Sequence, residues 1–119
     1  MTDHETKPDI SMSRTNAIAR LNDELRKTGQ GGKLMITRSV SKLSGYRPDI
    51  LATALAEYDG FSARNDPYAE RDFGNLTLFG TDLLWKIDYY DTEHKFGSED
   101  PANPEITRRV LTVMTAADW

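Results

Sequence analysis

Carboxylates are the residues of this 119-residue sequence with the clearest capacity for chemistry. Oxygen ligands of this type bind hard cations such as Mg²⁺ and Ca²⁺, and paired carboxylates can act as general acid and base. The segment 91–100, DTEHKFGSED, lacks the ligand spacing and the central glycine of an EF-hand loop. The candidate acids lie between residues 59 and 105: Asp59, Asp66, Glu70, Asp72, Asp88, Asp91, Glu93, Glu99, Asp100 and Glu105.

Two functions are open for these acids. We expect a non-enzymatic module that binds a basic protein partner, with no catalytic residue, no metal and no cofactor. Its surface would consist of Lys86, Asp88, Tyr90, Asp91, Glu93, Glu99 and Asp100. The alternative is a carboxylate-dependent metal-binding protein or small enzyme that uses Glu70, Asp72, Asp88 and Asp91, with His94 as a further candidate base.

The charge of the chain is unevenly divided. Residues 1–47 carry nine Lys and Arg against five acids, a net charge of +4, whereas residues 48–119 carry six against fourteen, a net charge of −8. Such polarity can steer charged partners. Direct nucleic-acid binding is not expected, because Asp23 and Glu24 interrupt the basic residues available for it: Arg20, Arg26, Lys27 and Lys33.

Two helices are predicted in the first half of the chain. One begins near Ser13 or Thr15 and buries Ile18, Leu21 and Leu25, so that Arg26 faces away from the buried stripe. The glycines at 29, 31 and 32 end it. The second begins near Pro48, because proline is tolerated in the first helical turn, and ends at Gly60. Its inner face is Ile50, Leu51, Ala54, Leu55 and Tyr58.

The strands are predicted from β-branched and alternating segments. The first covers Lys33–Thr37, and two more form a hairpin around residues 80–82. In the segment 83–90, Leu83, Trp85, Ile87 and Tyr89 share the covered face, and Lys86, Asp88 and Tyr90 the other. The β-branched segment RVLTVMT at 109–115 favours a final strand, while Ala116 and Ala117 are compatible with a helical ending, so both endings stay open. These elements predict a single α+β domain over residues 13–119: a small, mostly antiparallel sheet of three to four strands packed against two N-terminal helices.

The N-terminal segment, the length of the apolar runs and the cysteine content indicate where in the cell the protein is expected. Residues 1–12 are polar and are expected to be a disordered lead-in without the apolar core of a signal peptide. No apolar run approaches the roughly 20 residues that span a bilayer. The chain has no cysteine, so disulfides and thiolate metal sites are excluded. We therefore expect a cytoplasmic protein that does not associate with membranes.

Several long motifs occur in order along the chain: NDPYAERDFG at 65–74, LLWKIDYYD at 83–91, FGSEDPANP at 96–104 and TRRVLTVM at 107–114. Together they resemble a family of small bacterial proteins catalogued as a domain of unknown function, number thirty-seven sixty-eight. The segment IARLNDELRKTGQGGKLMIT at 18–37 is also similar to the opening of that family. The resemblance therefore spans nearly the whole chain after Arg14.

The resemblance implies no established activity. Members of the family occur in plasmid and phage-like regions, which implies a mobile-element accessory role. One concrete form is an inhibitor of a host defence nuclease, of the anti-CRISPR or anti-restriction kind, whose partner would be a basic, nucleic-acid-binding complex. The family pattern usually has His where this chain has Arg71. Because arginine stays charged and cannot coordinate a metal, this departure weakens the enzyme alternative.

Overall fold

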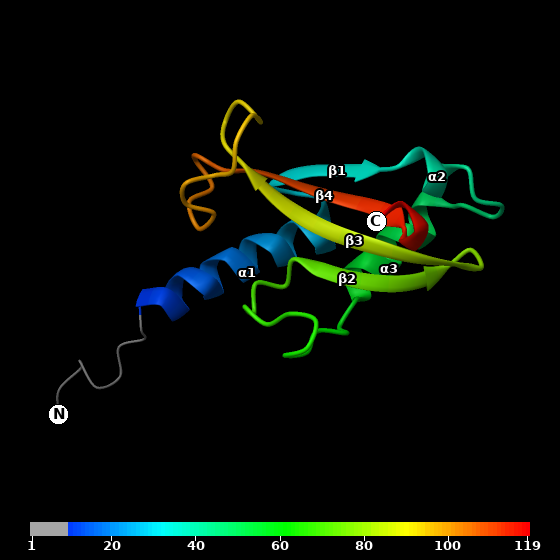
Figure 1. Cartoon of the computed structure of the whole chain (residues 1–119), viewed down its shortest axis with the longest axis horizontal. Helices are drawn as coiled ribbons and strands as arrows, with labels where there is room; N and C mark the ends of the chain where they lie inside the picture. The colour runs from blue at the N-terminus through cyan, green and yellow to red at the C-terminus, as the bar shows by residue number, and fades with distance from the viewer. Residues whose placement is uncertain (1–9) are drawn as a thin grey trace.

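A four-stranded sheet with helices on one face forms the fold (Figure 1). The computed structural model describes residues 10–119, with side chains from residue 13. The expected lead-in over residues 1–12 thus falls mostly outside the described residues, although α1 already begins at Ile10. In chain order the elements are α1 (Ile10–Thr28), β1 (Gly32–Ile36), α2 (Arg38–Ser41), α3 (Pro48–Glu57), β2 (Phe73–Leu78), β3 (Thr81–Tyr90), β4 (Arg108–Thr115) and the 3₁₀ helix η2 (Ala116–Asp118).

The strands are arranged in the order β1-β4-β3-β2. The β2–β3 hairpin and the β3–β4 pair are antiparallel, with Trp85 opposite Val113. The predicted α+β class with a mostly antiparallel sheet is therefore confirmed. β1 is the exception, because it runs parallel to β4, with Leu34 opposite Leu111. It lies at one edge of the sheet, far in sequence from its neighbour.

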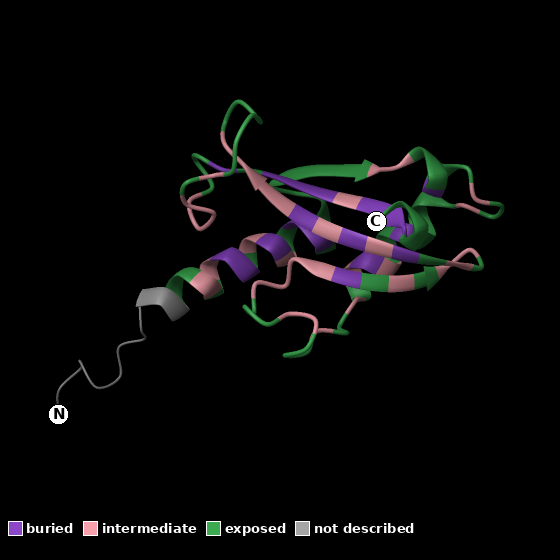
Figure 2. Ribbon diagram, in the orientation of Figure 1, coloured by how far each residue is buried: buried purple, intermediate pink, exposed green. Residues whose placement is uncertain are grey.

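The core lies between the sheet and the helices. The alternation predicted for β3 is confirmed, since Leu83, Trp85 and Ile87 are buried. From β4 come Leu111 and Val113, and the helices contribute Leu25, Val40, Leu51 and Leu55. Figure 2 shows these buried residues as bands along the central strands and on the inner sides of the helices. Burial of such apolar side chains contributes roughly 1.5–3 kcal/mol each.

The inner face of α1 differs from the prediction at Arg26. Its side chain is 5% exposed, and Asn22 is fully buried beside Ile18, Ala19 and Leu25. Arg26 therefore belongs to the buried stripe and does not face away from it. The reason is that its guanidinium has partners on α3, which are described below.

Gly32 allows β1 to lie close to β4. A Cβ atom at this position would approach the Arg109 carbonyl oxygen to 2.5 Å and Leu25 Cδ2 to 2.9 Å. Backbone does not yield to a contact that short, so any other residue would force β1 away from its neighbour. The requirement for glycine here is one of space, because the strand conformation itself is open to all residues.

Several aromatic and apolar side chains lie on the surface. Tyr68 is 79% and Phe96 is 72% exposed. Ile50, predicted on the inner face of α3, is 38% exposed. Within residues 10–119, none of the helices has the length and apolar composition to cross a bilayer.

Candidate partner-binding surface

The acid-rich segment between β3 and β4 is a folded loop. Asp91 N–H donates to the Phe96 carbonyl (2.8 Å) and Ser98 N–H to the Tyr89 carbonyl (3.0 Å). Tyr90 and Gly97 form an isolated antiparallel bridge. These bonds extend the β3 hydrogen-bonding pattern beyond the strand end, so the first half of the loop has a defined conformation.

Asp91 organises this first half. Its Oδ1 atom accepts hydrogen bonds from the backbone N–H groups of Glu93 (3.2 Å) and Lys95 (3.0 Å). These N–H groups, that of Lys95 first, lower the pKa of Asp91 below its usual value of 3.8 because they stabilise the ionised form. Asp91 therefore remains a carboxylate at neutral pH and holds the turn at 92–95.

Asp100 and Thr107 organise the second half. Asp100 Oδ1 accepts from the Ala102 N–H (3.2 Å) and forms an ion pair with Arg14 Nη2 of α1 (2.7 Å), which lowers the pKa of Asp100. Thr107 Oγ1 donates to the Asp100 carbonyl (2.9 Å) and lies 2.7 Å from Ser98 Oγ. Buried Arg109 also donates to the Pro101 carbonyl. The loop is thus fixed to both α1 and β4.

A groove of about 430 Å³ opens on the outer side of this loop. Its apolar lining is Phe96 and Ile106, which are 72% and 37% exposed. Asp91 and Glu99 stand beside them, together with Thr92 and Gly97. The groove therefore presents an exposed aromatic ring together with two acidic residues, a composition that resembles the apolar centre and polar rim of protein interfaces.

The structure brings some of the predicted surface residues together and separates others. Asp91 and Glu99 share the groove. On β3, Lys86 Nζ and Asp88 Oδ2 form an ion pair of 2.9 Å, and the Tyr90 ring lies 6.1 Å from that of His94. Glu93 pairs with Lys95 at 3.4 Å, and Asp100 with Arg14 as described above.

Phe96 and Ile106 are the groove residues that sequence reasoning missed. Phe96 was not assigned to the surface, because the loop around it carries no pattern that could place it. The available signal was its position, since it lies outside every alternating segment and is followed directly by Gly97.

The acids of the alternative function do not form one cluster. Glu70 Oε1 accepts a hydrogen bond from the Tyr89 hydroxyl (2.8 Å). Asp72 is half-buried beside it, and burial first, then the charge of Glu70, raises the pKa of Asp72 above 3.8. Asp91 is engaged in the loop. No group of three or more His, Asp or Glu side chains suited to a metal ion occurs among the described residues.

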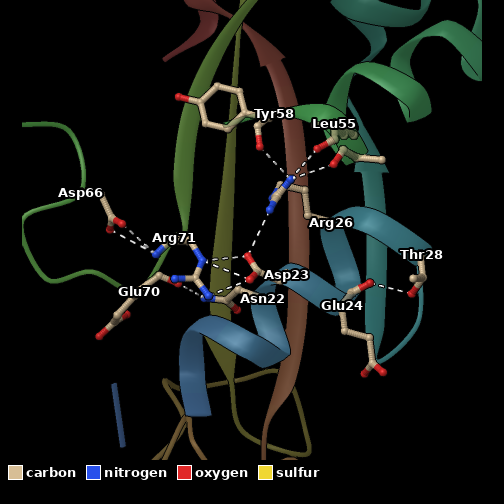
Figure 3. Close-up of polar contacts among 11 residues, drawn as sticks. Asn22, Asp23, Glu24, Arg26, Thr28, Leu55, Tyr58, Asp66, Glu70 and Arg71 are labelled. Carbon is tan, nitrogen blue, oxygen red and sulfur yellow. Dashed lines mark hydrogen bonds and ion pairs between the residues drawn. The ribbon is translucent and has the colours of Figure 1, made fainter. Parts of the chain in front are cut away.

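A second polar cluster lies inside the molecule (Figure 3). Arg26 Nη1 donates to the carbonyls of Leu55 (2.8 Å), Ala56 (3.3 Å) and Tyr58 (3.2 Å), at the C-terminal end of α3. A cation at this end of a helix satisfies free carbonyls and is favoured by the helix dipole. The bound guanidinium is buried, so it is not available to nucleic acid.

Asp23 joins Arg26 to the loop that precedes β2. Asp23 Oδ1 lies 3.0 Å from Arg26 Nη2. The Asp23 carboxylate also accepts bidentate hydrogen bonds from the Arg71 guanidinium, the shortest of which is 2.7 Å. The Arg71 backbone N–H also donates to the Asp66 carboxylate (3.1 Å). Arg71 thus fastens the 62–72 loop to α1, a role that its bidentate geometry suits.

The remaining members of this cluster tie α1 to the sheet. Asn22 donates to the Tyr89 hydroxyl (2.8 Å) and to the Glu70 carbonyl (2.9 Å), and accepts from Arg109 Nε (2.9 Å). Arg109 is 2% exposed and lies over the Tyr89 ring at 5.1 Å. Burial lowers the pKa of Arg109 and raises that of Tyr89, because each charged form is desolvated.

Comparison with known proteins identifies a family but no described relative. No curated protein and no solved structure matches the chain. A family model with the description "Protein of unknown function (DUF3768)" matches residues 36–118, which include α2, α3, β2 to β4 and the whole groove. Since this match covers well over half of the sequence, the chain belongs to the DUF3768 family.

Proposed function

We propose that the protein is a non-enzymatic protein-binding module whose acidic groove receives a basic partner. The observation that carries the proposal is the exposed Phe96 ring in a groove that Asp91 and Glu99 also line. Exposed aromatic residues are frequent anchors of protein interfaces. The ring would supply affinity, and the surrounding charge would select for basic partners.

Local ion pairs reduce this charge but do not remove it. Residues 86–105 carry six acids against two lysines, a net charge of −4. Asp88 and Glu93 pair with those lysines, and Asp100 pairs with Arg14. Glu99 and Glu105 are exposed and have no ion pair with another described residue. Opposite charges across an interface raise the association rate more than the affinity.

A basic partner that itself binds nucleic acid fits this chemistry. Carboxylates on the folded loop would occupy positions that otherwise receive phosphates. In this form of the proposal the protein inhibits a host defence nuclease, of the anti-CRISPR or anti-restriction kind, as an accessory of a mobile element. The further members of the surface would be Lys86, Asp88, Tyr90, Glu93 and Asp100.

The test compares proteins captured from a lysate of the native host by the wild type and by two variants. Phe96→Ala removes the anchor, whereas Tyr68→Ala removes an equally exposed ring outside the groove. We expect basic proteins that bind the wild type and Tyr68→Ala but are lost with Phe96→Ala. They should also elute as salt rises and the Debye length falls below about 10 Å.

Two results would contradict the proposal. One is a set of captured proteins that is the same for Phe96→Ala and for the wild type. The other is a groove-dependent partner that is acidic, or that stays bound unchanged from low to high salt.

A further inference from the structure

A basic pocket of about 470 Å³ lies where β1 and β4 begin, and Figure 1 shows both strands starting beside the loops on the left. The pocket is lined by residues 31–33, by His94 of the acid-rich loop, and by Pro104 and residues 107–109. None of these residues lines the acidic groove. Three of the eight lining residues are Lys or Arg, one is His and none is acidic, although the chain carries a net charge of −4.

Two of these cations, Lys33 and Arg108, lie on the same face of the sheet. Lys33 is the register partner of Val110, and residues two apart in a strand, such as Arg108 and Val110, point to one face. Both cations are exposed. Neither has an ion pair or a side-chain hydrogen bond with another residue that the structure describes, so their donors are available to a ligand.

Arg109 adds a buried positive charge to the wall of the pocket. It is 2% exposed, and its guanidinium donates to neutral groups, the Asn22 side-chain oxygen and the Pro101 carbonyl. Among residues 13–119 it has no ion pair, and the charge of Glu70 acts on it only from beyond ion-pair distance. Buried charges in proteins are usually paired. An anion in the pocket would bring opposite charge close to Arg109.

The neighbouring acids do not neutralise the pocket. Glu93 forms an ion pair with Lys95 (3.4 Å), and Glu105 is not among the lining residues. Glu24 of α1 lies beside Gly31 but lines a separate groove. A cleft lined by one sign of charge raises the local concentration of counter-ions. The pocket should therefore attract anions even though the protein as a whole is acidic.

We propose that this pocket binds a small organic phosphate, with the phosphate group held by Lys33 and Arg108. A phosphate dianion offers acceptor oxygens to both cations at once, and arginine forms paired hydrogen bonds with it. The pocket volume falls in the range of small-molecule sites, about 300–1,000 Å³, and a phosphate ion alone would leave most of it to water. His94 and Pro104 would border the organic part of the ligand.

The test is an NMR titration of the isotope-labelled full chain at constant ionic strength. The probes are adenosine monophosphate, inorganic phosphate, acetate and adenosine. We expect adenosine monophosphate to shift the amide signals of residues 31–33 and 107–109, and inorganic phosphate to shift the same signals with lower affinity. Adenosine and acetate should bind at least about tenfold more weakly than adenosine monophosphate, because neither offers a dianion to the two cations.

Variants of the two cations test the assignment of the phosphate position. Arg108→Gln and Lys33→Gln change exposed side chains and should leave the fold intact. Each should raise the dissociation constant for adenosine monophosphate at least about tenfold, since charge-assisted hydrogen bonds are lost. Arg38→Gln and Lys42→Gln are the matched controls, because both residues are exposed and lie outside the pocket. They should change the constant by less than about twofold.

Several results would overturn the proposal. One is the absence of shifts at residues 31–33 and 107–109 with either phosphate probe. Equal losses in the pocket variants and the controls would make the attraction a property of the overall charge, and acetate bound as tightly as inorganic phosphate would remove the selectivity for phosphate. A 5′-phosphorylated oligonucleotide that binds at these residues more tightly than adenosine monophosphate would assign the pocket to nucleic acid instead.

Discussion

The interior polar cluster and the acidic groove use similar residues for opposite purposes. In the cluster, Asp23 accepts hydrogen bonds from both Arg26 and Arg71, and buried Arg26 also donates to three carbonyls at the α3 end. In the groove, Glu99 has no ion pair with another described residue, and Phe96 is mostly exposed. The difference indicates that the interior cluster determines the position of α1, α3 and the 62–72 loop, while side chains of the groove stay free of contacts within the described chain, as the proposed binding role requires.

The largest effect should come from breaking the interior cluster at Arg26. Arg26→Ala leaves the carbonyls of Leu55 and Tyr58 and the Asp23 carboxylate without this partner, and we expect a loss of about 3 kcal/mol in the free energy of unfolding. Urea denaturation at pH 7 measures it. Arg20→Ala, at an exposed site on the same helix, is the control and should change stability by less than about 0.5 kcal/mol. A loss in Arg26→Ala as small as that in Arg20→Ala would mean that the buried contacts of Arg26 contribute little to stability.

A smaller effect, with opposite signs in the two regions, should come from the carboxyls of Asp72 and Asp91. The folded-state pKa of Asp72 is raised, so its ionised form destabilises the fold above that pKa, and the penalty disappears as pH falls. The pKa of Asp91 is lowered, so its contribution stabilises the fold above about 3.8, the ordinary Asp value, and is lost as pH falls through the folded pKa.

We therefore expect Asp72→Asn to raise the midpoint of urea unfolding at pH 7, and Asp91→Asn to lower it. Near pH 3 the gain from Asp72→Asn should be absent. A stabilising effect of Asp72→Asn that is the same at both pH values would show that charge is not its cause.

The smallest effect on stability should come from the groove itself. Phe96→Ala removes a side chain that is 72% exposed, and we expect the free energy of unfolding to change by less than about 0.5 kcal/mol. The same variant should lose the basic partner. If Phe96→Ala instead unfolds at a markedly lower urea concentration, the ring stabilises the loop. Phe96 would then have a structural role like that of the interior cluster.

Local pattern was sufficient for most of the fold. Alternation predicted the buried face of β3, and Pro48 marked the start of α3, because both signals lie within a few residues. The parallel pairing of β1 with β4 joins Leu34 to Leu111, and no local signal encodes a contact at that separation. An antiparallel sheet was the reasonable expectation for short strands.

The candidate site was only partly predictable for the same reason. Asp91 and Glu99 were identified by charge, whereas no sequence pattern marked Phe96 as part of the surface. The prediction placed Arg26 on the exposed face of α1 because it used the spacing of apolar residues alone. That spacing contains no information on carbonyl partners 29 or more residues away at the end of α3. Its position, one residue after buried Leu25 and four after Asn22, was nevertheless compatible with the inner face of the helix.

The fastening of the acid-rich loop has a consequence for recognition. Arg14 of α1 forms an ion pair with the Asp100 side chain. Thr107, just before β4, donates to the Asp100 carbonyl, and Arg109 of β4 donates to the Pro101 carbonyl. The loop has therefore lost its conformational freedom during folding, and a ligand does not have to order it again. Pre-organisation of this kind spares the entropic cost that weakens binding by flexible segments, so the proposed partner would meet a loop that is already ordered.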